Sequence, residues 1–356
     1  MTIGPVSVAH PPRVVLVTGV SRYLGAQVAA RLAAEPRIER VIGLDDREPT
    51  GEQVAILADS VKFERVDICT AEPARIVTGH RVEAVVHLDI ASAANPMAGG
   101  RAAMKEQNVI GTMQLLAACQ QAPDLRKIVI RSSTAAYGAS FRDPAVFTED
   151  TEPREVPRGG FARDVLDIEG YVRGFRRRRP DVAATVLRFA PLIGHHANTS
   201  LTRYFMSPLV PTVLGRDPRL QFIHVDDALE ILHRSVFEHH PGTFNVAGAG
   251  VIMLSQAVRR AGRVAVPLPE RGLSAFGRSG ANFSLDQLDL FVYGRVVDTS
   301  KLIDEYAYTP RPTPVAFADF LRGTGSVLPS DAIKALEKRI LAGIRQGRAA
   351  LGGDQT

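Results

Sequence analysis

Short apolar runs alternate with longer amphipathic segments through the first half of the chain. The apolar runs have the length of strands and occupy residues 13–19, 40–46, 61–68, 83–90, 126–133 and 181–190. Helical periodicity falls between them, at residues 25–34, at 108–122 and in a segment that begins near Phe161. Continuous Val, Ile and Leu runs separated by helices are typical of a parallel sheet that is covered on both faces. The pattern therefore predicts a doubly wound α/β fold of the Rossmann type.

The pattern loosens after residue 190, where Pro and Gly become more frequent and a further strand is predicted at 221–225. We expect a smaller substrate-binding lobe that is interleaved with the end of the first domain. The expected parts are a dinucleotide-binding domain at 12–190, to which strand 220–226 and segment 243–248 return, a mainly substrate-binding lobe at 191–325, and a helical tail at 326–356.

The tail carries one apolar stripe at helical spacing, made by Ile333, Leu336, Ile340, Ile344 and Leu351. Such a helix packs on its own domain, on a second subunit or on a membrane surface. Docking on protein is the simpler interpretation, and peripheral membrane contact is the alternative.

Composition adds limits to this picture. Apolar residues make up 45% of the 356 residues and charged residues 23%, as in ordinary soluble proteins. The only cysteines, Cys69 and Cys119, are fifty residues apart, which suits a reducing compartment and offers neither a disulfide framework nor a metal site. The first residues lack the pattern of a signal peptide, and no segment has the about 18 apolar residues of a membrane span. We therefore expect a cytoplasmic protein.

The net charge of +5 is spread along the chain, apart from four consecutive arginines at 176–179. Nucleic-acid binding would require such a run to lie in a recognisable module or among aromatic residues. Pro180 follows directly, so the run is interpreted as the solvated carboxyl end of a helix. We expect no nucleic-acid partner.

Candidate chemistry begins at TGVSRYLG, residues 18–25, which joins the first strand to the first helix. Gly19 permits a tight turn and Gly25 lets the helix approach the strand, while amides at the helix start can hold a pyrophosphate. Asp45 ends the second strand, where a carboxylate accepts hydrogen bonds from ribose hydroxyls. Asp67 ends the third strand and could face an adenine amine. These positions together predict a dinucleotide site with a preference for NAD over NADP.

The chain resembles the extended short-chain dehydrogenases/reductases of the NAD-dependent epimerase/dehydratase family, over roughly residues 12–325. The matching pieces, in order, are TGVSRYLG (18–25), VDI (66–68), HLDI (87–90), NVIGT (108–112), RSSTAAYG (131–138), LRFAPLIG (187–194), FIHVDDA (222–228), FNVAG (244–248), DTSKL (298–302) and YAYTP (306–310).

The resemblance implies roles for the matching residues. Ser133 takes the place of the active-site Ser/Thr, four residues before Tyr137, and Asn108 would support the fifth strand. The implied cofactor-binding residues are Gly19, Ser21, Arg22, Tyr23, Leu24, Gly25, Asp45, Asp67, Ile68, Leu88, Asp89, Ile90, Asn108 and Pro191. Family members of this kind often form homodimers through the helices at 108–122 and after Phe161, and we expect the same here.

The family pattern breaks at its proton-transferring pair. The family carries Tyr-x-x-x-Lys with a Glu four residues after the Lys, and Glu169 sets this register. The Tyr position is then Phe161 and the Lys position is Val165. Oxidation of a carbinol needs a base for the hydroxyl proton, and neither side chain can accept one. Ser133 alone is a poor base.

Two residues of the expected cofactor site also depart from the pattern. Arg22 replaces the middle glycine of the turn, and Asp89 stands where a small residue is usual. A carboxylate beside a pyrophosphate is unfavourable unless a cation intervenes. Arg22 is expected to reach Asp45 or Asp46 when no cofactor is bound, and a phosphate when one is.

Two functional hypotheses follow. The first is a catalytically degenerate family member that acts by binding NAD(P) or a partner. The second is an active oxidoreductase, epimerase or dehydratase with a substitute base, for which the candidates are Tyr137, Asp164, Asp89 and His195. Leu220 replaces the arginine with which the family's epimerases hold a nucleotide sugar, so such a substrate is disfavoured.

Overall fold

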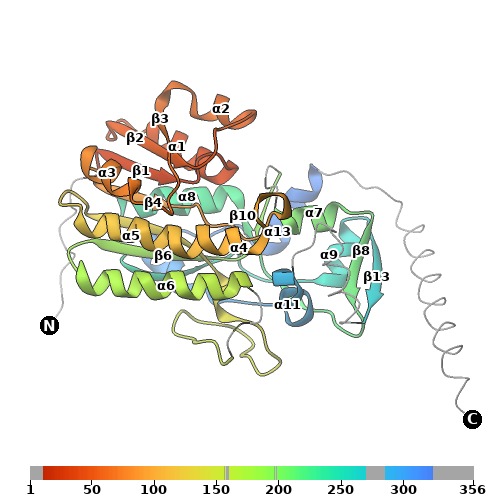
Figure 1. Cartoon of the computed structure of the whole chain (residues 1–356). Coiled ribbons are helices and arrows are strands. Elements are labelled where there is room, and N and C mark those ends of the chain that lie inside the picture. The colour runs from red at the N-terminus through yellow and green to blue at the C-terminus, as the bar shows by residue number, and fades with distance from the viewer. Residues whose placement is uncertain are drawn as a thin grey trace, which may run out of the picture.

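The computed structural model describes residues 11–323, apart from 156, 158–159, 196, 198 and 270–284. Its centre is a seven-stranded sheet with the order β11-β6-β5-β4-β1-β2-β3 (Figure 1). All six pairings in this sheet are parallel. The strands of this sheet are β1 (Val14–Thr18), β2 (Arg40–Asp45), β3 (Val61–Arg65), β4 (Ala84–His87), β5 (Lys127–Ser133), β6 (Ala183–Phe189) and β11 (Gly242–Val246). The predicted doubly wound parallel sheet is confirmed.

The remaining strands form short pairs beside this sheet. They are β7 (Leu192–Ile193) with β10 (Ile223–His224), β9 (Arg219–Leu220) with β12 (Ile252–Met253), and β8 (Leu209–Val213) with β13 (Val264–Leu268). The predicted strand at 221–225 is thus β10, which pairs with β7 and not with the large sheet.

Helices fill the connections. The helices are α1 (Tyr23–Ala33), α2 (Glu52–Leu57), α3 (Glu72–Gly79), α4 (Gly100–Lys105), α5 (Thr112–Gln121), α6 (Gly160–Arg178), α7 (Ser200–Met206), α8 (Val225–Phe237), α9 (Leu254–Arg260), α11 (Leu285–Tyr293), α12 (Ser300–Tyr306) and α13 (Thr313–Arg322). Four short helical segments are η1 (Ala58–Ser60), η2 (Pro96–Ala98), η3 (Glu106–Gly111) and η4 (Thr134–Tyr137). The π-helical segment η3 joins α4 to α5, so the helix predicted at 108–122 starts earlier.

The sheet is buried on both faces because its strands carry apolar side chains on both sides. Val15 and Val17 of β1 face one cluster of buried residues, to which α1 and α8 contribute. Leu16 faces the other cluster, to which α3, α5 and α6 contribute. Figure 1 shows α5 and α6 side by side on one face, with α1 and α8 on the other. The carboxyl ends of the strands are left free for a site.

The arginine run at the end of α6 is not simply solvated, as the sequence suggested. Arg176 donates to the carbonyl oxygens of Ala184 and Gly242. Arg179 donates to backbone carbonyls at the end of α5, including that of Cys119. These two cations donate to carbonyls of neighbouring elements, and they fix the end of α6 to the sheet and to α5.

A third cluster of buried residues forms the core of the lobe that follows the sheet. It is rich in aromatic rings, and Tyr204 stacks on Phe291 with ring centroids 4.2 Å apart. The chain leaves the sheet after β6, builds β7 to β10 and returns to the sheet as β11. The predicted tail at 326–356 lies outside the described residues, and no helix among those described is long and apolar enough to cross a membrane.

Candidate functional site

The turn after β1 has the geometry that its glycines permit. Gly19 has φ of +77°, and its amide donates to the Leu44 carbonyl at 2.8 Å. A side chain at Gly19 would meet the backbone of Asp89 at 3.0 Å, and one at Gly25 would overlap the carbonyl of Gly19. The backbones of three segments therefore meet here as closely as they can, and only glycine fits.

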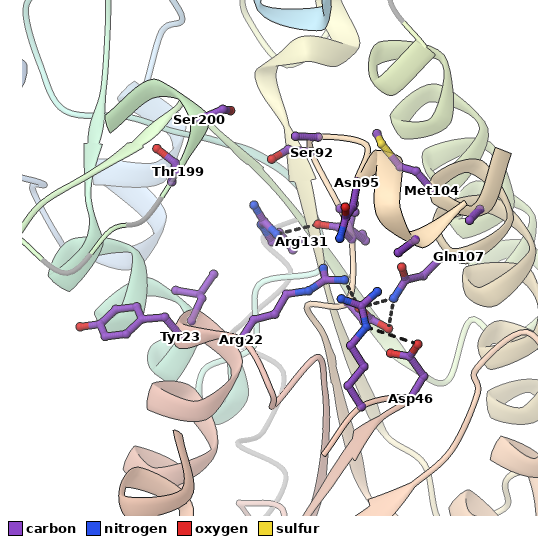
Figure 2. A pocket seen from close by; sticks show the side chains of 18 of the residues that line it. Arg22, Tyr23, Asp46, Ser92, Asn95, Met104, Gln107, Arg131, Thr199 and Ser200 are labelled. Atoms are coloured by element: carbon purple, nitrogen blue, oxygen red, sulfur yellow. Dashed lines mark hydrogen bonds and ion pairs between the residues drawn. The ribbon is translucent and has the colours of Figure 1, made fainter. Parts of the chain in front are cut away.

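A cavity of about 610 Å³ opens above this turn, at the carboxyl ends of β1 to β5 (Figure 2). Several residues of the expected cofactor site line it, namely Arg22, Tyr23, Leu24, Asp67, Ile68, Asp89 and Ile90. The other expected residues around this turn do not line the cavity, namely Gly19, Ser21, Gly25, Asp45, Leu88 and Asn108. The cavity lies where the order of the strands reverses, because β2 is on one side of β1 and β4 is on the other. A nucleotide usually binds at this point in such sheets.

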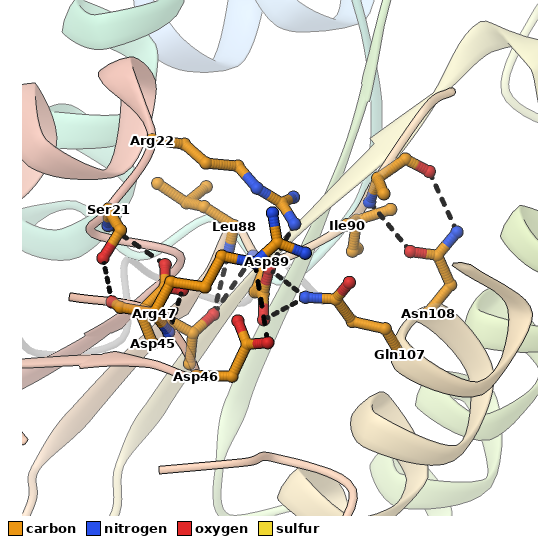
Figure 3. Close-up of polar contacts among 12 residues, drawn as sticks. Ser21, Arg22, Asp45, Asp46, Arg47, Leu88, Asp89, Ile90, Gln107 and Asn108 are labelled. Carbon is orange, nitrogen blue, oxygen red and sulfur yellow. Dashed lines mark hydrogen bonds and ion pairs between the residues drawn. The ribbon is translucent and has the colours of Figure 1, made fainter. Parts of the chain in front are cut away.

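Asp45 is buried, and its oxygens are engaged by the turn (Figure 3). The carboxylate accepts the amide of Ser21 at 3.0 Å and that of Arg47 at 3.1 Å. Burial raises the pKa of Asp45 to about 6, and the nearby charge of Asp89 adds to the rise. Asp46 and Arg47, the next residues along, lie in the cavity wall. Asp45, the acid expected at the ribose, thus holds the turn through these two hydrogen bonds.

Asp89 is the partner of Arg22, in place of the expected Asp45 or Asp46. The guanidinium of Arg22 lies 3.0 Å from the Asp89 carboxylate, which also accepts the side-chain amide of Gln107 at 2.9 Å and 3.0 Å (Figure 3). Asp89 is only 1% exposed. Arg22 is therefore the cation that makes a buried acid tolerable beside a phosphate-binding turn.

A buried hydrogen-bonded chain lies beneath the turn. The Oγ1 of Thr18 lies 2.8 Å from Nδ1 of His87, and Nε2 of His87 lies 2.9 Å from Oγ1 of Thr112. Burial lowers the pKa of His87 to about 3, so its ring is neutral. Thr18 Oγ1 also accepts the amides of Leu88 and Asp89. The chain holds the ends of β1 and β4 together beside the cavity.

Asn108 supports the segment that follows β4, whereas the resemblance implied support of the fifth strand. Its side chain accepts the amide of Ala91 at 2.8 Å and donates to the carbonyl of the same residue at 2.9 Å. It also donates to Asp164 at 3.1 Å, and Arg101 pairs with that carboxylate. Asp164, a candidate substitute base, is thus buried and occupied by a network that fixes α6.

A smaller chamber of about 110 Å³ adjoins the large cavity and contains the expected catalytic position. Ser133, Phe161 and Pro191 line it. Phe161 is 8% exposed, and Val165 is fully buried in the cluster beneath α6. Phe161, which the position of Glu169 assigns to the family's Tyr position, thus lines the same chamber as Ser133.

The candidates for a substitute base do not converge on this chamber. Tyr137 donates to Asn245 at 2.7 Å and accepts from Arg188 at 2.9 Å, in a buried network with Glu169. His195 lies against Gly323 and lines neither cavity. Asp89 lines the large cavity but is paired with Arg22.

Comparison with known families shows to which family the chain belongs. The model of the NAD-dependent epimerase/dehydratase family matches residues 15–247. The chain belongs to this family. The resemblance inferred from the sequence is confirmed, and the glycine turn and sheet order are those of a family member.

Relatives of this family member span most of its length. A Mycobacterium tuberculosis protein of uncharacterized function is 46% identical over 324 residues, which is 89% of this chain and 86% of that protein. A dTDP-glucose 4,6-dehydratase of Neisseria gonorrhoeae is 26% identical over 66% of this chain and 72% of its own.

Solved structures share the fold. The UDP-glucose 4-epimerase of Thermotoga maritima, with UDP-glucose, superposes with a TM-score of 0.70 at 19% identity and covers 87% of this chain and 98% of its own. The dTDP-glucose 4,6-dehydratase of Streptomyces venezuelae, with NAD and TYD bound, has a TM-score of 0.67 at 19% identity and covers 87% and 96%.

Several residues of the site escaped the sequence reasoning. Gln107 precedes Asn108 and holds Asp89, while Arg131 and Thr134 flank the expected catalytic Ser133. The one available signal was a charge inside the strand run KIVIRSS, because a cation in a buried strand requires a reason.

Proposed function

We propose that this member of the NAD-dependent epimerase/dehydratase family binds NAD(H) in the large cavity and acts through binding, without turnover of a sugar nucleotide. The proposed partner of the bound nucleotide is a small molecule or another protein. The observation that carries the proposal is the pair Phe161 and Val165, which are buried and apolar at the positions of the family's proton-transferring Tyr and Lys.

Physical chemistry supports the absence of turnover. A tyrosine acts as a base near neutral pH only when a neighbouring cation lowers its pKa, and Phe161 offers no hydroxyl at all. Tyr137 and Asp164 are held in buried hydrogen-bonded networks, away from the lining of the small chamber. The alternative, an active enzyme with a substitute base, would require one of these networks to open.

The cavity and the relatives support NAD as the cofactor. The glycine turn approaches the sheet without side chains, and Arg22 offsets Asp89 where the pyrophosphate would bind. The dehydratases of Streptomyces venezuelae and Bacillus anthracis, both with this fold, carry NAD in their structures. Asp45 would disfavour the additional phosphate of NADP.

Two measurements test the proposal. Isothermal titration of the purified protein with NAD, NADH and NADP is expected to give a saturable isotherm that is tightest for NAD or NADH. Incubation with UDP-glucose or dTDP-glucose and NAD is expected to give no epimer, keto-sugar or change in NADH absorbance. The proposal fails if none of the three nucleotides binds. It also fails if turnover is robust and persists in Ser133→Ala, since a base outside the family's machinery would then be at work.

A further inference from the structure

We propose that the small chamber binds the anionic group, a carboxylate or a phosphate, of a small-molecule ligand between Arg131 and Arg295. The inference rests on the proposed function in one respect, because the ligand would then lie beside the cofactor. It adds a class of ligand, an acid, to a protein in which Leu220, in place of the family's arginine, disfavours a nucleotide sugar.

The chamber is a branch of the large cavity. The two share part of their lining, namely Ile90, Ser92, Arg131, Leu192, Thr199 and Ser200. Figure 2 shows Arg131 between Ser92 and Arg22, on the side of the view toward Thr199. The chamber therefore lies beside the large cavity, so a ligand in the chamber would lie next to a nucleotide in the cavity.

The charge of the chamber is one-sided. Among the described residues that line it, Arg131 and Arg295 are the only charged side chains. Neither guanidinium has a carboxylate within 4.0 Å in the described part of the chain. The nearest acids act from farther away, and they are Asp89 for Arg131, and Asp289 and Asp143 for Arg295.

Both guanidinium groups retain donors. Arg131 donates one hydrogen bond, to the carbonyl of Ile90 at 2.9 Å. Arg295 donates two, both to the carbonyl of Gly138, at 3.1 Å and 2.6 Å. Each guanidinium has five N–H groups, so most remain available. Burial lowers the pKa of each arginine to about 10. The acids of the protein therefore only partly offset the loss of water around these two cations.

A hydroxyl without a partner gives independent support. Thr134 is 1% exposed and lines the chamber, and its Oγ1 has no hydrogen-bond partner among the described residues. A buried hydroxyl without a partner is costly, and such groups call for a ligand or a water. Ser133 accepts the amide of Ala135 at 3.1 Å, so its proton is free to be donated. Two residues with hydroxyl groups thus line the same chamber as the two arginines.

An anion satisfies all four groups at once. Carboxylates and phosphates accept several hydrogen bonds, and arginine donates to them in pairs with matching geometry. A neutral ligand would leave both half-buried cations without an opposite charge. The pyrophosphate of NAD belongs at the start of α1 beside Arg22, so it does not account for Arg295, which lines the chamber but not the large cavity.

Thr134→Val is the sharpest test, because it removes a hydroxyl that has no partner and keeps the shape. The variant is expected to be as stable as the wild type or more so, since no hydrogen bond is lost. Its affinity for an anion is expected to fall roughly tenfold, as for loss of one hydrogen bond to a charged group. Arg295→Lys keeps the charge but loses the paired N–H donors of the guanidinium, and Arg131→Gln removes the charge. Both variants are expected to bind the anion roughly tenfold more weakly, or weaker still.

The probes are inorganic phosphate and malonate, titrated by calorimetry into NAD-saturated protein at constant ionic strength. The matched control is Arg216→Gln, which removes an arginine from the wall of a different cavity. At least one of the two anions is expected to bind, and to bind the wild type and the control with equal affinity. The anion that binds more tightly indicates whether the natural ligand carries a phosphate or a carboxylate. The inference is overturned if wild type binds neither anion, or if Thr134→Val, Arg295→Lys and Arg131→Gln all bind as wild type does.

The same titrations without NAD separate this inference from the proposed function. If NAD does not bind but the anion does, and Thr134→Val weakens the anion, the proposed cofactor is wrong and the anion site stands. If NAD binds and no anion does, the cofactor assignment stands and the anion site is wrong.

Discussion

Arg22 and Asp89 meet in the wall of the large cavity, where the buried acid beside the phosphate-binding turn would otherwise repel a dinucleotide. In Arg22→Ala, Asp89 loses its cation, and its charge then faces the pyrophosphate without compensation. We expect the affinity for NAD to fall at least tenfold in this variant, measured by calorimetry. Asp89→Asn in the Arg22→Ala background removes the repulsion and is expected to restore most of the affinity. Equal losses in the single and double variants would contradict this account.

Asp45 makes stability depend on pH. Its pKa is raised from 3.8 to about 6 in the folded chain, which holds the proton more tightly than the unfolded chain does. The contribution of Asp45 to the free energy of unfolding is therefore fully present below about pH 4 and is lost as the pH rises through about 6. A shift of this size corresponds to on the order of 2–3 kcal/mol.

Asp45→Asn is expected to abolish that contribution. The variant loses a carboxyl group whose two oxygens accept two amides, so it is less stable than the wild type at pH 4. The difference between the two proteins should narrow by about 2 kcal/mol or more between pH 4 and pH 7, measured by urea unfolding. A difference that stays constant over this range would exclude Asp45 as the titrating group.

The partner of Arg22 could not be chosen from the sequence, and the reason lies in the sheet order. β1 lies between β2 and β4, so the turn after β1 faces the ends of both neighbours. Sequence reasoning favoured Asp45 and Asp46 after β2, whereas Asp89 after β4 is the partner. The positions of the glycines and acids followed from spacing, but the direction of a long side chain depends on packing that the sequence does not express.

At the scale of elements, α6 is fixed to the sheet by a buried ion pair. The guanidinium of Arg188 on β6 donates to both oxygens of Glu169, at 2.9 Å and 2.6 Å, and Ser132 of β5 donates to the same carboxylate. Glu169→Gln leaves this cation without an opposite charge and is expected to lower the free energy of unfolding by about 3–5 kcal/mol, measured with urea. The paired change Glu169→Met with Arg188→Met should cost less than the single change. A single-variant loss below about 1 kcal/mol would mean that solvent reaches the pair.

Helices and strands with a clear apolar pattern were predicted from the sequence, and those without one were missed. The strand β1, an almost wholly apolar run, and the strand β5, with Ile128, Val129 and Ile130 in succession, were found close to their ends. The helix α4 was missed because it follows Gly99, begins at Gly100 and buries only Met104. Its conformation is set by contacts with α6 and η3, which no local pattern expresses.

For the whole molecule, we predict a homodimer through the outer faces of α5 and α6. Ile110 of η3, which leads into α5, and Tyr171 of α6 are each 37% exposed. Light scattering at micromolar concentration should give twice the mass of the chain. Tyr171→Glu places a charge on this face and is expected to shift the protein towards monomer, whereas Val54→Glu, on the exposed α2, should not. A monomeric wild type would refute the prediction.

The order of strands also has a consequence for synthesis. β6 is complete once residue 189 has been added, but its neighbour β11 ends only at residue 246, after much of the lobe has been made. On the ribosome, translating the intervening segment takes on the order of several seconds at typical rates. During that time β6 has an open edge that is able to pair with another nascent chain. Chaperone capture during translation should therefore concentrate in this interval, and end when the strand that closes the sheet emerges.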